Sequence, residues 1–259
     1  MTIQIIKNSA TSSISIDELV DFLRSEIDFK DTDSIQSAHH NFGRLFLNKD
    51  LIKNHILHEI KRGTTDFESI NKYTPPSLIL YACQDFFIRA NLWRATEQYL
   101  DNDINLYGLA HDHNFDFLTL NYKGPGYTSK MYTYDYSNIN GYINEPVKLY
   151  DNGFLNLSEG EMYFYRKNLD VHSQFPPRED SITINLMVSL PQYNHTNQFI
   201  FDTTNSVIQK IYGGFFSQKH IYDMALLLND HECNALMLEI ASKNENKKSS
   251  IYINSRISK

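Results

Sequence analysis

The stretch that decides the fold runs from His111 to Gly126 and reads HDHNFDFLTLNYKGPG. Successive side chains of a β-strand point to opposite faces, so His111 and His113 lie on one face and Asp112 points away. Aromatic and β-branched residues continue this face until Gly124-Pro125-Gly126 forces a turn. The pattern therefore predicts a half-buried strand that presents two imidazoles beside an apolar wall.

A third histidine, His172, follows a turn, a strand and a short loop, and it precedes the double proline Pro176-Pro177. Neutral imidazole is a borderline ligand that binds zinc, iron, copper or nickel. Two imidazoles are too few for a metal site, and His172 supplies the third. The sequence therefore predicts that His111, His113 and His172 hold a metal ion. The alternative is that they are ordinary strand residues, hydrogen-bonded to their neighbours.

The two segments resemble the paired motifs of the cupin superfamily, which have the forms G-x5-H-x-H-x3-E-x6-G and G-x5-P-x-G-x2-H-x3-N. His111, His113 and Gly124 match the first motif. Gly160 and His172 correspond to the second motif, with one extra residue between them. The resemblance covers about residues 105–190, and the chain departs from the motifs at Asn105, Phe117, Arg166 and Asn168.

Phe117 stands where the family commonly has its glutamate ligand. Without that carboxylate, the resemblance implies a facial site of three neutral histidines, similar to that of the thiol dioxygenase branch of cupins. Three facial ligands leave coordination positions open for O2 and an organic substrate. The resemblance implies Fe(II) as cofactor, with Zn, Ni or Mn as the alternatives. It also implies an α+β fold, in which a cupin-like antiparallel β-barrel (double-stranded β-helix) is flanked by N-terminal and C-terminal helices.

The predicted function is that of a non-haem Fe(II)-dependent, 2-oxoglutarate-independent oxygenase acting on a small amino-acid-like or carboxylate substrate. A site of two histidines and one carboxylate would place an acid two residues after His111, where this chain has His113. Two alternatives stay open. One is a non-redox Zn, Ni or Mn enzyme that acts as an isomerase, lyase or hydrolase, and the other is a non-enzymatic ligand-binding cupin.

Side chains near the two motifs are candidates for substrate binding. A guanidinium near a metal in an apolar cavity suits a carboxylate, because its fork pairs with both oxygens. Aromatic side chains crowd between residues 107 and 165, where they would line the interior of a barrel. The alternative for each candidate is a surface salt bridge or ordinary packing. The predicted substrate-binding residues are Arg166, Arg178, Tyr132, Tyr134 and Gln174.

The chain divides into a helical, a strand-rich and a second helical part. Ser15–Arg24 begins with an N-cap and has helical spacing of apolar residues, whereas residues 104–190 show short alternating runs separated by turn residues. Later segments, beginning with Ser206–Gly213, again look helical. The predicted parts of one compact unit are an N-terminal helical extension over 1–80, a cupin-like barrel with the metal site over 81–202, and a C-terminal helical segment over 203–259.

Three further strands are predicted around the site. Lys130–Tyr136 alternates strictly and follows the glycine turn, so it is expected to form a hairpin with the strand that carries His111 and His113. Ser181–Val188 follows the double proline and is rich in β-branched residues, which indicates a strong strand. Residues 84–94 are interpreted as a strand that enters the barrel.

Composition limits the partners. The 259 residues include 24 Lys and Arg against 31 Asp and Glu, which gives a net charge of -7. This balance argues against a general nucleic-acid binder and gives no support for docking on an anionic membrane. Two cysteines make no disulfide framework, and no apolar run approaches about 18 residues. A cytoplasmic protein is expected, with a small-molecule substrate and O2 as partners and edge strands that offer a route to a homodimer.

Overall fold

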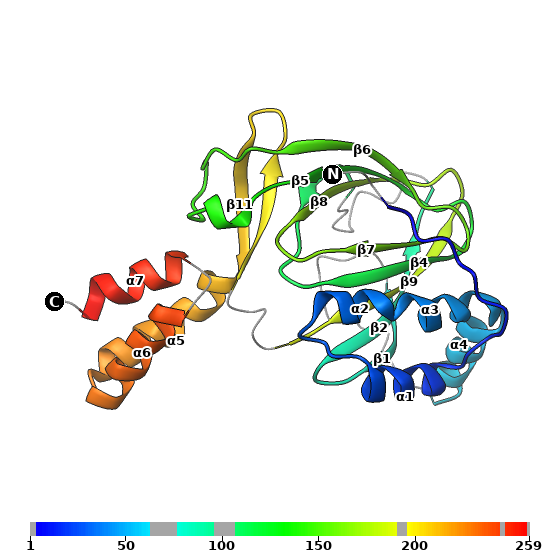
Figure 1. The fold of residues 1–259 in the computed structure, drawn as a ribbon, viewed down its shortest axis with the longest axis horizontal. Helices are drawn as coiled ribbons and strands as arrows, with labels where there is room; N and C mark the ends of the chain where they lie inside the picture. Colours follow the sequence, from blue (N-terminus) through cyan, green and yellow to red (C-terminus); the bar gives the residue numbers. More distant parts are fainter. Residues whose placement is uncertain (1–3, 63–76, 96–106, 191–195, 244–246, 258–259) are drawn as a thin grey trace.

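The computed structural model describes residues 4–62, 77–95, 107–190, 196–243 and 247–257. Helices near the N-terminus cover one face of a first antiparallel sheet, and a second antiparallel sheet faces the first (Figure 1). Three helices near the C-terminus project to the side (Figure 1). Two antiparallel sheets with flanking helices make an α+β fold, the class that the sequence predicts.

The first helix, α1 (Ile16–Glu26), begins where the sequence predicts it. The hydroxyl of Ser15 accepts a hydrogen bond from Glu18 N, and the Glu18 carboxylate accepts one from Ser15 N, so the two residues form a capping box. The buried residues of α1 face the first sheet and include Leu19 and Leu23. The helices that follow are α2 (Thr32–Ser37), α3 (His39–Phe42), the 3-10 helix η1 (Gly43–Leu47) and α4 (Leu51–Arg62).

The strands of the described ranges form two sheets. The first has the order β1-β2-β9-β4-β7 and consists of β1 (Ser77–Ala82), β2 (Phe86–Trp93), β4 (Phe117–Lys123), β7 (Met162–Tyr165) and β9 (Ser181–Val188). The second has the order β11-β10-β3-β8-β5-β6. It consists of β3 (Ala110–His111), β5 (Thr128–Thr133), β6 (Tyr150–Asn156), β8 (Asp170–Phe175), β10 (Asn197–Asp202) and β11 (Val207–Gly213), with the 3-10 helix η3 (Tyr136–Asn138) between β5 and β6.

The strands from β2 to β9 pair in a nested order, with β5 against β6, β4 against β7, β3 against β8 and β2 against β9. A hairpin rolled up in this way is a jelly roll, also called a double-stranded β-helix. The predicted closed barrel is corrected in one respect: no pairing between described strands joins the two sheets. The chain crosses from one sheet to the other in unpaired turns, so the layers form a sandwich.

Alternation along the first sheet separates an outer face from an inner face. The outer residues Ile88, Leu118 and Leu186 are fully buried against the N-terminal helices. Each such side chain contributes about 1.5–3 kcal/mol by leaving water. The inner residues Phe117 and Met187 belong to a separate cluster that also contains residues of the second sheet. The helices therefore seal the outside of the first sheet, and its inside faces the second sheet.

Two predicted elements around the histidines differ in the structure. The chain changes sheet between His111 on β3 and Phe117 on β4, so the single predicted strand is divided between opposite layers. As a consequence β5 pairs with β6 and β8, and not with the strand that carries His111. The predicted helix Ser206–Gly213 is wrong, because this segment is the strand β11 paired with β10. A short apolar run of this kind is compatible with a helix or a strand, and pairing with β10 makes this segment a strand.

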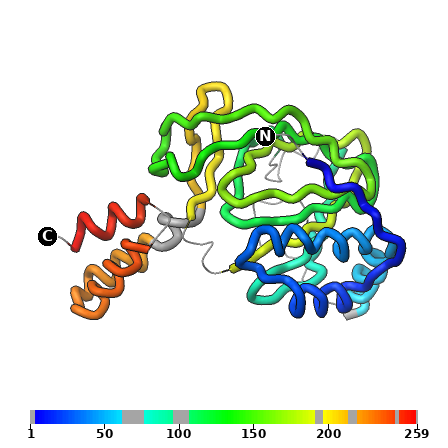
Figure 2. The backbone as a smooth tube through the Cα atoms, viewed as in Figure 1, coloured from blue at the N-terminus to red at the C-terminus, as the bar shows by residue number. Residues whose placement is uncertain are grey.

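The helices α5 (Gly214–Leu228), α6 (His231–Lys243) and α7 (Lys247–Ile257) pack on one another and extend away from the sandwich (Figure 2). Tyr222, Met237 and Ile253 are buried between them. The predicted boundary after residue 80 falls inside β1, and the boundary after residue 202 falls between the paired strands β10 and β11. Within the described ranges, none of the helices has the length and apolar character that a membrane span requires.

Candidate metal centre

The side chains of three histidines meet inside the sandwich. His111 on β3 lies opposite His172 on β8 in the strand register, and His113 follows two residues later. Nε2 of His172 is 3.1 Å from Nε2 of His111 and 3.0 Å from Nε2 of His113. One ligand atom from each lies within 4.8 Å of the others, and in the described part of the chain no other group of three His, Cys, Asp or Glu side chains has this spacing. The structure therefore brings the three histidines together, and their role as metal ligands stays a prediction.

Hydrogen bonds determine which ring nitrogen carries the proton. Nδ1 of His111 lies 3.0 Å from the carbonyl oxygen of Leu109, so Nδ1 donates and Nε2 keeps a lone pair. Nδ1 of His172 lies 3.1 Å from the side-chain nitrogen Nε2 of Gln174, whose amide oxygen is buried without a partner among the described residues. An amide turned so that this oxygen faces Nδ1 leaves the lone pair of His172 on Nε2 as well. A cation between the Nε2 atoms would relieve the repulsion of these lone pairs.

The three imidazoles are neutral at neutral pH. Burial lowers the pKa of His111, whose side chain is only 5% exposed. Burial also lowers the pKa of His113 well below its ordinary value, and repulsion from a protonated His111 and from the charge of Arg89 lowers it further. Burial is again the largest cause for His172, whose pKa also lies well below its ordinary value, and repulsion from protonated His111 and His113 lowers it further. Neutral imidazole is the form that binds a metal ion, so the rings are in the protonation state that coordination requires.

The spacing of the nitrogens fits a divalent first-row ion. Ligands about 2.1 Å from a metal are about 3.0 Å apart at right angles and about 3.4 Å apart in a tetrahedron. The two observed separations, 3.0 and 3.1 Å, lie closer to the right-angled arrangement of an octahedral ion. The group contains three neutral nitrogen donors and no carboxylate. This donor set suits a divalent ion such as iron or zinc.

Aromatic rings of the first sheet and of the segment before it cover the imidazoles. The ring centroids of Phe115 and Phe117 lie 4.9 and 4.8 Å from that of His113. The ring of Tyr165 lies 4.5 Å from that of His172 and stacks on Phe117 at 4.4 Å. Phe117, at the motif position of the glutamate ligand, thus packs against the imidazoles. The apolar wall that the sequence predicts is present, and most of it comes from the opposite sheet.

Hydrogen bonds on the far side fix the segment that carries His113. Asp112 is fully buried and faces away from the imidazoles. Its carboxylate accepts hydrogen bonds from the Tyr134 hydroxyl and from Phe199 N, both at 2.6 Å. Burial raises the pKa of Asp112 to about 7. Asn168 N donates to the carbonyl of His113 at 2.7 Å. These contacts hold the crossing between the sheets, and with it the position of the His113 ring.

Among the five predicted substrate-binding residues, Gln174 lies at the centre, on the same face of β8 as His172. Arg166 instead donates from Nε and from a terminal nitrogen to Asp170, at 2.9 and 2.6 Å, in the turn between β7 and β8. Arg178 is exposed in the loop before β9. The guanidinium of Arg166 is therefore paired with the buried carboxylate of Asp170 in the same turn.

The two predicted tyrosines lie on the other face of the second sheet. Met131 is in register with His172, so the next residue along β5, Tyr132, points away from the histidines. Tyr132 and Tyr134 pack in a cluster with Val171 and Phe199 on that outer face. Their roles as substrate ligands stay predictions, and the structure places neither of them beside the imidazoles.

The structure places on the inner face an arginine that the sequence analysis does not single out. Arg89 lies on β2, and its Nε is buried without a hydrogen-bond partner among the described residues. Burial lowers its pKa to about 10, so the guanidinium stays charged at neutral pH. Its charge also lowers the pKa of His113. The spacing of apolar residues in β2 could not have identified it, because both faces of this strand are covered.

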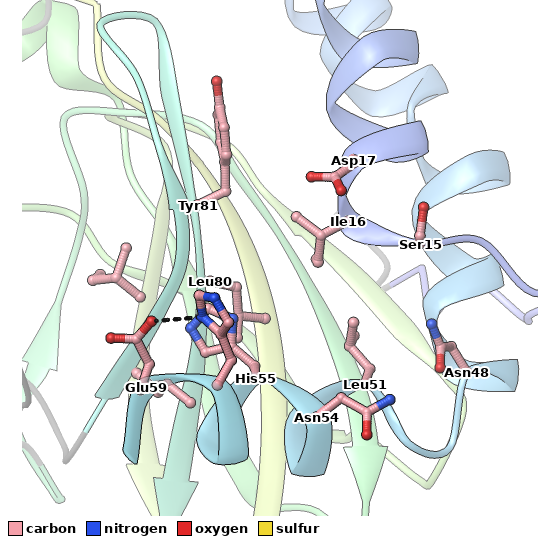
Figure 3. A pocket seen from close by; sticks show the side chains of 13 residues that line it. Ser15, Ile16, Asp17, Asn48, Leu51, Asn54, His55, Glu59, Leu80 and Tyr81 are labelled. Carbon is pink, nitrogen blue, oxygen red and sulfur yellow. Dashed lines mark hydrogen bonds and ion pairs between the residues drawn. The ribbon is translucent and has the colours of Figure 1, made fainter. Parts of the chain in front are cut away.

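A separate groove lies between α1, α4 and β1 (Figure 3). It has a volume of about 720 Å³, and its lining includes His55, His58, Leu51 and Leu80. Nδ1 of His58 lies 3.3 Å from the carboxylate of Glu59. None of the three histidines of the metal centre lines this groove, so it is a distinct feature on the outer side of the first sheet.

The fold and the histidine group define a jelly-roll protein with a candidate three-histidine metal centre. No protein-family model matches the chain, and no curated protein matches it. The chain is similar to a crystal structure of hydroquinone 1,2-dioxygenase from Sphingomonas sp. TTNP3 with 4-hydroxybenzoate bound, at 9% identity and a TM-score of 0.31, over 49% of this chain and 71% of that one.

Two other solved structures have similar parts. One is a conserved protein with a double-stranded β-helix domain from Klebsiella pneumoniae, at 10% identity and a TM-score of 0.26, over 53% of this chain and 93% of that one. The other comes from a study of DMSP lyases, at 10% identity and a TM-score of 0.25, over 71% of this chain and 77% of that one. Similarities of this size decide neither the family nor the reaction of this chain.

Proposed function

We propose that the chain is a cupin-type metal-dependent enzyme in which His111, His113 and His172 hold Fe(II) as facial ligands. We propose further that it is a 2-oxoglutarate-independent oxygenase of a small carboxylate or amino-acid-like substrate. The observation that carries the proposal is the convergence of three neutral imidazoles, with Nε2 separations of 3.0 and 3.1 Å for the two pairs that include His172.

The donor set favours an open site. The described group supplies three protein ligands and no fourth, and the aromatic ring of Phe117 stands where a carboxylate ligand would extend. A metal bound by three protein ligands keeps positions for small molecules, whereas a closed set of four ligands is typical of a structural ion. Fe(II), when bound, would supply the one-electron chemistry by which O2 reacts with an organic molecule.

Neighbouring residues orient the imidazole rings and keep water away from them. The Leu109 carbonyl and the Gln174 amide orient the rings of His111 and His172 through their Nδ1 atoms. The rings of Phe117 and Tyr165 close the side of the first sheet and exclude bulk water from the imidazoles.

A non-redox enzyme is the second candidate, because three neutral histidines are also a ligand set of catalytic zinc. In that case the ion would act as a Lewis acid in an isomerase, lyase or hydrolase. A ligand-binding cupin without catalysis would use the same inner face, and its ligand affinity would survive replacement of His111 and His113 by alanine.

Metal analysis of protein purified anaerobically tests the site. The wild-type chain should hold about one iron per chain, and H111A/H113A less than about a tenth of that. His58→Ala removes a histidine of α4 whose side chain is 64% exposed, so it is the matched control and should leave the iron content unchanged. Full iron content in the double variant would overturn the assignment.

Oxygen uptake then tests the reaction. Consumption of O2 that requires iron, an added carboxylate and the three histidines, in the absence of 2-oxoglutarate, is the expected result. Turnover that proceeds without O2 and with zinc would support the non-redox enzyme instead. Folded protein that binds iron yet turns over no carboxylate with either metal would contradict both enzymes.

A further inference from the structure

Apolar side chains lie on two opposite sides of α5, and one of these sides is exposed. Tyr222 and Leu226, four residues apart, pack into the cluster between α5, α6 and α7. Ile221, Met224 and Leu228 lie about 150° away around the helix axis, and all three are exposed. A helix that is apolar all round is normally buried. The exposed side of α5 therefore has the composition of a covered surface and no cover among the described residues.

The exposed residues form a continuous row. Ile221, Met224 and Leu228 follow the spacing i, i+3, i+7, which makes them neighbours along one side of the helix, and Leu227 flanks them. We call these four residues the α5 stripe. Their exposed fractions are 60, 58, 74 and 85% in that order, and Leu227 and Leu228 are the two most exposed large apolar residues of the described chain. Contiguous exposure of this kind is typical of an interaction surface.

The α5 stripe offers no charge that would select an acidic or a basic partner. The charged side chains of α5 are Lys219 and Asp223, which form an ion pair with each other. Amphipathic helices that lie on membranes have a polar face rich in Lys and Arg, whereas α5 has one lysine and this lysine is paired. The surface therefore suits an apolar protein surface better than an anionic membrane.

The geometry of the stripe suits pairing with a second copy of itself. The spacing i, i+3, i+7 is that of the seam between two packed helices, where each side chain inserts between side chains of the facing helix. Two copies related by a two-fold axis present the same patch to each other, and a row without charge opposes no like charges when it pairs with itself.

The size of the stripe is sufficient for a dimer. A fully exposed Leu, Ile or Met residue presents about 180 Å² of surface, so the four residues offer about 500 Å² per chain and about 1,000 Å² per pair. Specific interfaces between proteins begin at about this total area. Polar residues at the rim of the stripe would add to it.

We propose that the chain forms a two-fold symmetric homodimer in which the α5 stripe of one chain packs against the α5 stripe of the other. The three C-terminal helices extend away from the sandwich (Figure 2), so pairing through α5 needs no contact with the metal centre. The inference is independent of the proposed function. It also differs from the expected route through edge strands, because the contact is made by helices.

Sedimentation equilibrium of the full chain tests the dimer. The chain has a mass of 30.2 kDa, so the wild-type protein should sediment with twice that mass at about 10 μM. Met224→Glu together with Leu228→Glu brings four carboxylates into the apolar contact and should raise the dissociation constant at least about 100-fold. A wild-type chain that stays monomeric up to about 100 μM would overturn the inference.

A matched control locates the contact on α5. Ile60 on α4 is 61% exposed, as Ile221 is at 60%, so I60E makes the same kind of change away from the stripe and should keep the wild-type dissociation constant. A wild-type constant in M224E/L228E would count against the stripe and support edge-strand pairing. If circular dichroism shows that M224E/L228E has lost helix, Leu228→Gln replaces it. L228Q should weaken the dimer about tenfold, and an unchanged constant would overturn the inference.

Vesicles of phosphatidylcholine and phosphatidylglycerol test the other occupant. The wild-type chain should stay in the supernatant when the vesicles are sedimented. A monomeric wild-type chain that sediments with the vesicles, while M224E/L228E does not, would overturn the dimer in favour of a membrane surface. Iron content of M224E/L228E should equal that of the wild-type chain, so loss of the dimer and failure of the metal site are measured separately.

Discussion

The side-chain nitrogen Nε2 of Gln174 lies 3.1 Å from Nδ1 of His172, two residues earlier on the same face of β8. The oxygen of this amide is buried and has no partner among the described residues. An imidazole that offers Nε2 to a metal must carry its proton on Nδ1, and a proton there needs an acceptor. With its amide turned so that the oxygen faces Nδ1, Gln174 accepts the proton of His172 there and leaves the lone pair of this ring on Nε2.

Replacement of Gln174 by leucine should weaken metal binding about 10- to 100-fold, because Nδ1 of His172 loses its acceptor. Replacement by glutamate keeps an oxygen at this place and should retain most of the affinity. Competition with a chromophoric chelator measures both dissociation constants. Unchanged affinity in Q174L, with the wild-type melting temperature, would mean that the amide does not orient the ring.

Metal removal should destabilise the folded chain. A ligand that binds only the folded state adds about 2.7 kcal/mol of stability at 100 times its dissociation constant. For a chain of this length that corresponds to a rise in melting temperature of about 5–10 °C. Thermal unfolding with Fe(II) under nitrogen, compared with the chelator-treated chain, measures the shift. H111A/H113A should show no shift, and H58A should show the wild-type one; equal shifts in all three proteins would contradict the site.

The part of the site that sequence could predict depends on short spacings. The placing of His172 and Gln174 on one face follows from alternation inside β8, whereas His113 lies two residues beyond the end of β3, in the crossing between the sheets. The capping box of Ser15 and the strong strand Ser181–Val188 are likewise local signals, and the structure contains both. The convergence of His172 on the other two histidines was predicted from the motif resemblance, because periodicity contains no long-range information.

The part that sequence could not predict depends on long-range pairing. The change of sheet between His111 and Phe117 follows from the nesting of β3 with β8 and β4 with β7, pairs that lie about 40 to 60 residues apart. Arg89 was missed for a related reason: both faces of β2 are covered, so its apolar spacing does not distinguish inside from outside. The pairing of Arg166 with Asp170 is not of this long-range kind, because the two residues are only four positions apart in the sequence.

Acid should destabilise the metal-free chain. The folded-state pKa values of His113 and His172 lie well below the ordinary value of 6.5, chiefly because the rings are buried. Below that pH the unfolded chain binds protons that the folded chain does not, so stability falls as pH falls from about 6.5 towards the folded-state values. Each such histidine contributes a slope of up to about 1.4 kcal/mol per pH unit.

Urea denaturation at pH 7.5 and 5.5, with a chelator present, measures this loss. The control is a variant in which the three histidines are replaced by glutamine, which does not titrate. Its stability should change less between the two pH values than that of the wild-type chain. The same loss in both proteins would show that other groups, and not the buried imidazoles, cause the acid sensitivity.

Arg166→Gln should change stability and leave the metal centre intact. The side chain of Asp170 is only 1% exposed, that of Arg166 is 29% exposed, and the closest approach of the pair is 2.6 Å. Because the variant leaves a buried carboxylate short of donors, urea denaturation should show a loss of about 1–3 kcal/mol. R166Q/D170N removes the charge as well and should recover part of this loss. Iron content and the affinity for a small carboxylate such as benzoate, measured by calorimetry, should equal the wild-type values. Weaker binding of the carboxylate at unchanged stability would instead support the predicted role of Arg166 as a substrate ligand.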